Sequence, residues 1–475
     1  MKIKNFAPIE RITDFELTKH EGEHSYLNFT ASISNVAAEK FLAFTGKNIS
    51  VTADDNAPIF FGRVETVEVE NSIGAARVFV SCISLSVTAD EDAKTRIFHN
   101  PDKKISDVLS TARLTLSPAD LKIAKEFSAL KYSPVILQNQ ETNFQFMSRL
   151  AKRFGKRFWV IDTMNQANFF IDSCVEKSAR KIGGNKILSI SQAKVGKQFK
   201  FFIKSQSFFD IGQVVTLEKI AGEFVIVGLT LRLEDESYIF RYELEENKLT
   251  VPPLSIEPYL CKSAKLHAKV INTKDPKNLG RVQVLFDDKY IEDMDKKNPL
   301  WIDYRTPYAG KNGGIVFIPD EGDAVEVIFT NEEIFCVSAV RENPLAAECQ
   351  NVKDKYIGNN FNQRMFWKEK SLEFFSDKYK IVMNDKGIEI AVGENSVTLN
   401  EQGIFLKTMS GKISMTKDIA IDSGGKFEVK ANDAEIKSSG KVKLGGSEFS
   451  AESSGAANVK AGSTLKLNGS KIELR

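Results

Sequence analysis

The stretch from 388 to 475 carries a regular repeat in which two apolar side chains flank one residue that is mostly polar or small. We call this pattern the apolar repeat. Its pairs are Ile388/Ile390, Val397/Leu399, Ile404/Leu406, Ile413/Met415, Ile419/Ile421, Phe427/Val429, Ala434/Ile436, Val442/Leu444, Phe449/Ala451, Ala457/Val459, Leu465/Leu467 and Ile472/Leu474. Successive pairs are about seven to eight residues apart, the length of a short strand plus a tight turn. Only one face of each strand can therefore be dry.

A unit of this size offers two modest apolar side chains and cannot close a core by itself, since a solenoid coil made by one chain needs about 20 or more residues per turn. Identical chains must supply the missing walls. The pattern therefore predicts an intertwined β-prism, a needle built by several copies about a long axis. The residues expected at that axis are Ile413, Ile421, Val429, Ile436, Leu444, Val459 and Leu467.

Composition indicates a large multidomain protein of 475 residues with a formal net charge of +2, which argues against a dedicated polyanion binder. The five cysteines are scattered and odd in number, which favours reduced thiols in a reducing cytoplasm. They are Cys82, Cys174, Cys261, Cys336 and Cys349. The first fifteen residues, MKIKNFAPIERITDF, lack the apolar run of a signal peptide, and no apolar stretch approaches about 18 residues. We expect a protein that is made and assembled in the cytoplasm without a signal peptide.

The composition of the chain changes after its last proline, Pro344: the residues from Ser371 onward contain no Pro, Cys, Trp or His. This change predicts a domain boundary near 345–370. Upstream, residues 1–89 and 170–250 are rich in β-branched and aromatic residues and predict strands. Residues 103–130 are expected to be helical, as is Glu141–Phe154, with Thr142 or Asn143 as its cap. The expected domains are 1–89 (first β-barrel), 90–169 (α/β segment), 170–255 (second β-barrel), 259–345 (small barrel), 346–370 (linker) and 371–475 (β-prism needle).

Several motifs then make a family resemblance specific. The stretches VINTKDPKNLGRVQVLFD, WIDYRTPYAGKNGG and FIPDEGDAVEVIF, between 270 and 329, resemble the oligonucleotide/oligosaccharide-binding (OB) barrel of VgrG-family spike proteins from contractile tails. PIFFGRV (58–64), KTRIFHNPDKKISDVL (94–109) and QNQETNFQFMSRLAKRFGKRFWVID (138–162) resemble the hub of the same family. The matches occur in the family's order of hub, small barrel and prism.

The resemblance implies a mainly β, multidomain fold: a hub with two barrel-like domains and a small α/β part, an OB-fold barrel and a trimeric needle. It implies a homotrimer that seats on a hexameric Hcp-like inner tube and on baseplate proteins, transmits thrust and transiently pierces a target membrane. Effectors would travel as separate cargo. A type VI secretion spike and the spike of an extracellular phage-tail-like particle or bacteriocin both remain open. A β-rich surface adhesin is a less favoured alternative.

The residues that could take part in catalysis do not predict an enzyme. Acidic clusters at 90–92, 234–236 and 287–295 could in principle do acid–base work, but they fall in polar loops between strands. Family relatives with a muramidase carry it between barrel and prism, where this chain has only about thirty residues, 341–370. Neither His20 and His24 nor any other part of the sequence forms a metal-binding or nucleophile motif. We therefore expect neither a catalytic residue nor a cofactor.

The small barrel also raises the alternative of nucleic-acid binding, because Lys274, Lys277 and Arg281 are basic. Asp275, Asp287 and Asp288 dilute that charge, so the sequence predicts no nucleic-acid partner. The C-terminal end contains no histidine for a metal-capped tip and stops after a full apolar pair. We therefore expect a separate PAAR-type protein to cover this end, with a frayed end in solvent as the alternative. The expected contacts are Leu465, Leu467, Ile472 and Leu474.

Overall fold

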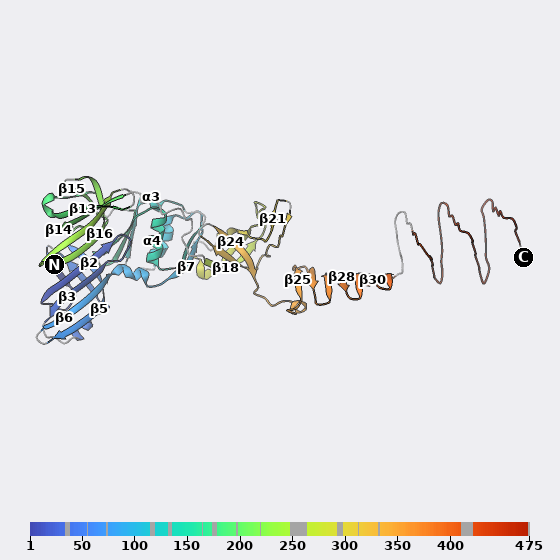
Figure 1. Cartoon of the computed structure of the whole chain (residues 1–475), viewed down its shortest axis with the longest axis horizontal. Helices are drawn as coiled ribbons and strands as arrows, with labels where there is room; N and C mark the ends of the chain where they lie inside the picture. Colours follow the sequence, from blue (N-terminus) through green and yellow to red (C-terminus); the bar gives the residue numbers. More distant parts are fainter. Residues whose placement is uncertain are drawn as a thin grey trace. The chain divides into compact units, whose positions relative to one another are not determined.

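A computed structural model describes residues 1–33, 39–54, 56–72, 75–114, 119–131, 135–163, 165–172, 178–195, 198–218, 220–247, 264–291, 298–311, 313–330, 333–409 and 421–473. The chain forms two compact units, Met1–Pro344 and Leu345–Arg475 (Figure 1). Each unit is described by itself. Within the described residues, no helix is both long and apolar enough to cross a membrane.

The first unit is dominated by a 12-stranded sheet whose main path runs β1-β4-β5-β6-β3-β2-β16-β17-β14-β13, with β12 and β15 attached at β16. Its strands are β1 (Lys2–Lys4), β2 (Arg11–His20), β3 (Tyr26–Ile33), β4 (Asn48–Thr52), β5 (Pro58–Ser72), β6 (Ala75–Ser84), β12 (Arg180–Ile182), β13 (Ile187–Val195), β14 (Gln198–Ser205), β15 (Val214–Leu217), β16 (Ile220–Glu234) and β17 (Ser237–Glu246). A short helix, α1 (Glu39–Leu42), precedes β4.

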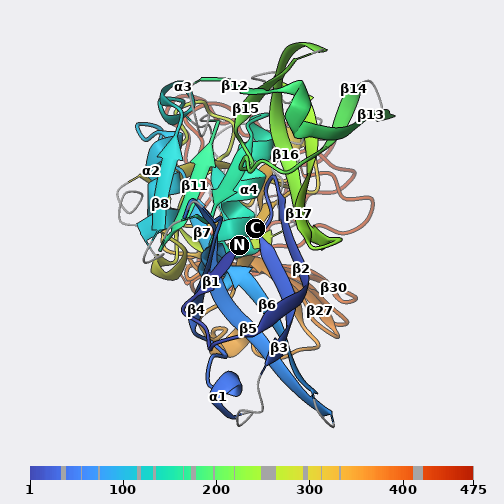
Figure 2. The same cartoon turned by 90° about the vertical axis from the view of Figure 1, so that its left-hand side faces the viewer.

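The sheet is built from two halves with the same topology. In the first half the path is β5-β6-β3-β2, and in the second half it is β16-β17-β14-β13, with the strands following one another along the chain in the same way. β2 and β16 pair antiparallel and join the halves, as Figure 2 shows. One buried core serves both halves, with Phe15 and Leu17 from the first and Leu229 and Tyr242 from the second.

The two halves lie in the segments 1–89 and 170–255, in which the sequence predicts two barrel-like domains. The strands occur where the sequence patterns predict them, but the structure joins them in one sheet around one core. The physical reason is that β2 and β16 each present apolar side chains to the same interior, so pairing them removes two exposed sheet edges at once.

A smaller α/β part lies between the halves in sequence. It contains β7 (Lys94–Phe98) paired with β9 (Ile136–Glu141), and the sheet β10-β11-β8 formed by Phe158–Ile161, Ala167–Ile171 and Ala119–Ile123. Its helices are α2 (Ile105–Leu114), α3 (Lys125–Ser128) and α4 (Asn143–Arg153). The expected single helical region 103–130 is therefore wrong, since β8 divides it and pairs parallel to β11.

Helix α4 lies where its apolar spacing predicts. Thr142 caps it: the Thr142 hydroxyl accepts from the Gln145 amide, and the Gln145 side chain accepts from the Thr142 amide. Gly155 follows the helix with a φ of 65°, the left-handed conformation that terminates helices.

The small barrel is closed, in the order β18-β19-β20-β24-β23. Its strands are Ala264–Asn272, Val282–Phe286, Leu300–Tyr304, Ile334–Val340 and Ala324–Phe329 in that order. Burial alternates strictly along β18, as expected for a strand with one dry face. The core of the barrel also includes Ile97, Val135 and Leu137 from the α/β part, so the barrel packs against that part.

The second unit opens with a seven-stranded antiparallel meander, β25 to β31. Its strands are Lys355–Gly358, Arg364–Trp367, Ser371–Phe375, Tyr379–Asn384, Gly387–Val392, Asn395–Asn400 and Gly403–Lys407. The expected linker 346–370 is therefore wrong in its second half, because β25 and β26 lie there and begin the sheet. These strands are only four residues long, and they are defined by pairing of β25 with β26 and of β26 with β27.

Residues 421–473 contain no strand in the single chain (Figure 1). The chain bends at small or turn-forming residues at intervals of about seven to eight positions. These bends lie at 424–425, 432–433, 439–440, 447, 454–455, 462–463 and 470. The segments between bends carry the apolar repeat but find no hydrogen-bonding strand partner within the described part of this chain.

Candidate functional site

The most conspicuous unpartnered surface of the described chain is the apolar repeat itself. Its side chains at Ile421, Ile436 and Leu444 are 67%, 83% and 68% exposed. The other described residues expected at a needle axis or tip are also exposed: Val429, Val459, Leu465, Leu467 and Ile472. Ile413 and Leu474 lie outside the described residues. A single chain thus leaves a long series of apolar groups in water, which is unfavourable unless another chain covers them.

The meander of the second unit has the same property. Its seven strands form one layer, and among their described side chains only Phe366 and Ala391 are buried apolar groups. Apolar members of the repeat on β29 to β31, such as Ile390, Leu399 and Ile404, remain exposed. A one-layer sheet has no core of its own, so these residues also require a covering surface.

The joint between the two halves of the first unit holds a buried ionic cluster. The Lys19 ammonium on β2 donates to Asp162 Oδ1 at 2.6 Å, to Asp210 Oδ1 at 3.1 Å and to the Ile59 carbonyl at 2.7 Å. All three charged side chains are almost fully buried. The cluster therefore ties together β2, the end of β10, the start of β5 and the loop before β15.

The electrostatics of this cluster follow from burial and from its excess of acid over base. Burial raises the pKa of Asp210, and the nearby charge of Asp162 raises it further against the opposing effect of Lys19. Burial alone lowers the pKa of Lys19, but its two carboxylate partners outweigh burial and raise the net pKa. Lys19 is therefore held as a cation in the interior.

The acidic clusters singled out in the sequence are engaged in ordinary contacts. Glu234 accepts from Arg241 at 3.0 Å, and this hydrogen bond lowers the pKa of Glu234, the opposite of what a general acid needs. Asp90 binds His24 Nε2 at 2.7 Å and also accepts from Thr142; these contacts outweigh burial and lower the Asp90 pKa. Part of the 287–295 cluster, 292–295, lies outside the described residues.

His24 occupies a triad-like position without access for a substrate. Its Nδ1 lies 2.6 Å from Ser86 Oγ and its Nε2 binds Asp90, but Ser86 is buried and its hydroxyl also contacts Ser84 Oγ at 2.7 Å. The ring packs against Phe144 of α4, with the two ring planes tilted by 36°. This network joins η1 (Leu85–Asp90) to the start of α4, a structural role. No cluster of metal-ligating side chains occurs in the described ranges.

The basic residues of the small barrel do not form an open cationic groove. Arg281 is held by Asp275, with Nη2 2.6 Å from Oδ1, and Asp275 also accepts from the amides of Lys277 and Leu279. The Arg281 hydrogen bond lowers the pKa of Asp275 well below its usual range. Asp275 thus organises the turn between β18 and β19.

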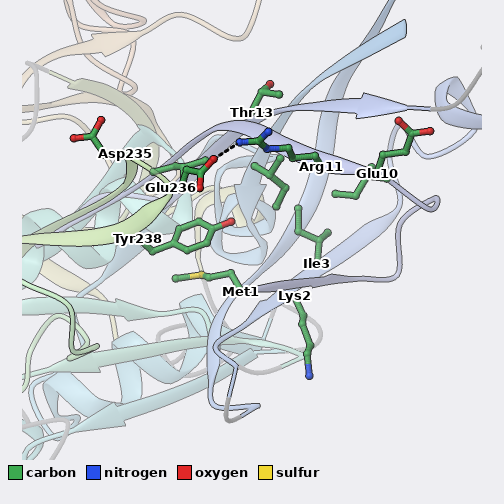
Figure 3. Close-up of a pocket in the computed structure, with 12 residues that line it drawn as sticks. Met1, Lys2, Ile3, Glu10, Arg11, Thr13, Asp235, Glu236 and Tyr238 are labelled. Atoms are coloured by element: carbon green, nitrogen blue, oxygen red, sulfur yellow. Dashed lines mark hydrogen bonds and ion pairs between the residues drawn. The ribbon is translucent and has the colours of Figure 1, made fainter. Parts of the chain in front are cut away.

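A pocket of about 930 Å³ opens at one end of the β2–β16 joint (Figure 3). The start of β2 and the β16–β17 turn line it, and the Arg11 guanidinium binds Glu236 at 2.6 Å across it. The Tyr238 ring and Ile3 contribute apolar walls. Both ionic groups are largely exposed, and the pocket brings together no base, nucleophile and oxyanion donors.

Two features of the site escaped the sequence patterns. Lys19, Asp162 and Asp210 lie far apart in the chain, and a lysine inside an alternating strand resembles a solvent-facing residue. The two-fold repetition of strand pairing was expected only as a similarity of layout, because the halves share no obvious sequence repeat. In both cases the information lies in which strands pair.

Comparison with known proteins agrees with this geometry. Residues 266–335 match the family described as the type VI secretion system/phage-baseplate injector OB domain. No curated protein sequence matches the chain significantly. Among solved structures, the E. coli c3393 protein has a TM-score of 0.53 at 14% identity, over 72% of this chain and 99% of its own. It is described as a component of the type VI secretion system with structural similarity to the T4 bacteriophage tail proteins gp27 and gp5.

A chain of the lidded Francisella PdpA–VgrG complex gives a TM-score of 0.56 at 9% identity, over 84% of this chain and 76% of its own. The half-lidded form of that complex gives 0.55 at 8% identity, over 84% and 83%. At such identities the likeness concerns the fold. Residues 266–335 thus match the injector OB domain of type VI secretion systems and phage baseplates, within a fold that resembles those of the c3393 protein and the PdpA–VgrG complex.

Proposed function

We propose that this protein is the central spike of a contractile injection machine and that it works as a homotrimer. The observation that carries the proposal is the exposed apolar repeat of the second unit, from β29 to Ile472. Three copies wound about a common axis would give every repeat the strand partners and the dry interior that one chain lacks. The injector OB domain and the spike-like fold of the first unit support the same role.

The proposed mechanism is mechanical rather than enzymatic. Contraction of a sheath supplies the work, and the trimer transmits the thrust as a stiff rod that pierces a target membrane. The absence of proline after Pro344 suits this role, because every backbone amide in the needle stays available for cross-chain pairing. Asp90 and Glu234, from two of the acidic clusters, are engaged with basic or hydroxyl groups. These contacts argue against a role for either carboxylate in hydrolysis.

The proposed partners follow from the two ends of such a spike. The hub would seat on a hexameric Hcp-like tube and baseplate proteins, and a PAAR-type protein would cover the apolar tip at Leu465, Leu467, Ile472 and Leu474. Effectors would be carried as separate cargo. We propose that the chain is assembled in the bacterial cytoplasm and leaves it only when the machine contracts. The spike of an extracellular phage-tail-like particle or bacteriocin is the second candidate, because the OB-domain family covers both secretion systems and phage baseplates.

The proposal is tested by the mass of the purified full chain in solution together with low-resolution imaging. A trimer with a long thin projection is expected. A compact monomer over a wide concentration range would contradict the trimeric spike, since the apolar repeat would then have no partner.

The tip is tested separately. Removing residues 470–475 should abolish capture of a small PAAR-type protein, while the trimer mass stays unchanged because most of the repeat remains. Undiminished capture by the shortened chain would show that the tip is not the binding surface.

A further inference from the structure

The 12-stranded sheet of the first unit has two long strand edges that have no strand partner among the described residues, besides the short edges of β1 and β12. One is the outer edge of β13, which pairs only with β14. The other is the second part of β5, from Glu65 to Ser72, because β4 covers only Pro58–Arg63 and the backbone of Val64 is bonded to Gly46 and Lys47. An open edge of this kind pairs readily with another strand.

The two halves of the sheet correspond position by position. Following the paired residues across each half gives two equivalent rows. These rows are Phe15–Phe29–Val80–Val67 in the first half and Ile190–Ile203–Tyr242–Leu229 in the second. The register irregularities repeat as well. They lie between Ile12 and Asp14, Ile187 and Ser189, Val64 and Thr66, and Ile226 and Gly228. β13 is thus the counterpart of β2, and β5 is the counterpart of β16.

The counterparts of the two free edges are already joined inside the chain. β2 pairs with the second part of β16, with Leu229 opposite Lys19 and Leu231 opposite Leu17. The first part of β16 pairs with β15, just as the first part of β5 pairs with β4. The chain therefore contains one complete joint of this type. The free edges of β13 and β5 are the two unpaired halves of a second one.

Burial at equivalent positions supports this interpretation. Phe15 is fully buried at the internal joint, whereas its counterpart Ile190 on β13 is 46% exposed. Leu229 is fully buried, whereas its counterpart Val67 on β5 is only partly buried. A second copy of the chain would cover both apolar positions by repeating the internal joint.

We propose that β13 of one copy pairs antiparallel with the second part of β5 in the next copy, in the register of the internal β2–β16 joint. Lys19 lies four positions after Phe15, so Val67 should lie opposite Lys194. On the other face of the strands, Glu68 should lie opposite Ala193 and Glu70 opposite Ser191. This inference rests on the proposed trimer and specifies the strand pairing that would join its hubs.

The two edges differ from each other, so the contact is head-to-tail and must close as a ring or run on as a filament. Three copies would close into a ring of alternating internal and cross-chain joints. The cross-chain joint lacks a counterpart of the ion pair between Glu16 and Arg232, whose equivalents are Ser191 and Glu70. At the cross-chain joint, Lys194 takes the position that Lys19 occupies at the internal joint, where Lys19 meets two buried carboxylates. The cross-chain joint should therefore be the weaker of the two.

A cysteine pair tests this register. Directly opposed residues of antiparallel strands have Cα atoms about 4.5–5.5 Å apart, within the range a disulfide spans. The full-length Glu68→Cys/Ala193→Cys variant, after mild oxidation, should give covalent dimers and trimers on a non-reducing gel. The matched control is Glu68→Cys/Ser189→Cys, which places the two residues about 13 Å apart in the same register. Each single variant controls for the native cysteines.

The outcomes separate this inference from the trimeric spike. A trimeric mass without cross-linking, or with equal cross-linking of the control, overturns the β13–β5 joint and leaves the spike intact. A monomeric mass without cross-linking overturns both. Hydrogen exchange of the unmodified protein gives a second measure: amides of 189–194 should exchange more slowly than those of an open edge strand, although less slowly than those of β2. Rapid exchange of that segment in a trimer would contradict the joint even if the cysteine variants fail to fold.

Discussion

At the scale of single residues, the Lys19 cluster is the feature that most affects stability. Replacing Lys19 with Met would leave Asp162 and Asp210 buried beside each other without a cation. Breaking a buried ion pair by removing one partner costs about 3–5 kcal/mol. We expect a loss of this size in the unfolding free energy of the first unit, measured by denaturant titration.

Arg232→Met is the matched control for this change. Arg232 forms its ion pair with Glu16 at the same β2–β16 joint, but both side chains are substantially exposed. Exposed pairs contribute about 0–1 kcal/mol, so this variant should be nearly neutral. Equal losses in the two variants would mean that burial does not distinguish the pairs. Asp210→Asn added to Lys19→Met should recover part of the loss, because one buried charge is removed.

Asp275 gives a prediction about pH. Its pKa is lowered by Arg281 and by backbone amides, so its folded value lies below the unfolded value. Such a group contributes stability at neutral pH that is lost as the pH falls below about 4, where the unfolded carboxyl takes up its proton. The melting temperature of Asp275→Asn should therefore lie below that of the native chain at pH 7, and the difference should be smaller, though not abolished, at pH 3. A constant difference across this range would contradict the assignment.

At the scale of elements, helix α4 shows how a local signal and tertiary contacts combine. Thr142 caps the helix and also donates to Asp90, which binds His24. Thr142→Ala should lower the unfolding free energy by about 1 kcal/mol from the cap alone, and by more because Asp90 loses a donor. Thermal unfolding measures the loss. Thr142→Ser keeps the hydroxyl and should retain most of the stability; a loss equal to that of alanine would place the effect in the methyl group.

The other elements divide according to how local their determinants are. The apolar spacing of α4 and the alternation along β18 identify those elements without further information. The region 103–130 was misassigned because β8 is a strand only by virtue of its parallel pairing with β11. Likewise, β25 and β26 are strands only through the pairing of β25 with β26 and of β26 with β27. Short strands are decided by their partners, which the local sequence does not contain.

At the scale of the whole molecule, the apolar repeat makes assembly the decisive property. Leu444→Asp would place one carboxylate per chain at a dry axis, where an unpaired charge is very costly. We expect loss of the trimeric needle, seen as a lower mass by light scattering and as a lower unfolding temperature. Ile421→Asp should behave in the same way.

Lys443→Asp is the matched control, because Lys443 lies between the apolar partners Val442 and Leu444 and should face solvent. It also introduces an aspartate but should leave the mass unchanged. If Leu444→Asp leaves both mass and unfolding unchanged, the repeat does not line an axis. If Lys443→Asp is equally disruptive, the assignment of faces is wrong.

The sequence by itself determined the β class, the OB-domain motifs and a C-terminal repeat that no single chain can bury. These follow from alternation and from short motifs, which are local properties. Only the tertiary structure decided that the two strand-rich segments form one sheet, that Lys19 is buried between Asp162 and Asp210, and that β13 and β5 end in complementary edges. These features depend on pairing between strands that are distant in the chain. The energy of such a pair depends on both strands, so the sequence of one strand alone does not determine it.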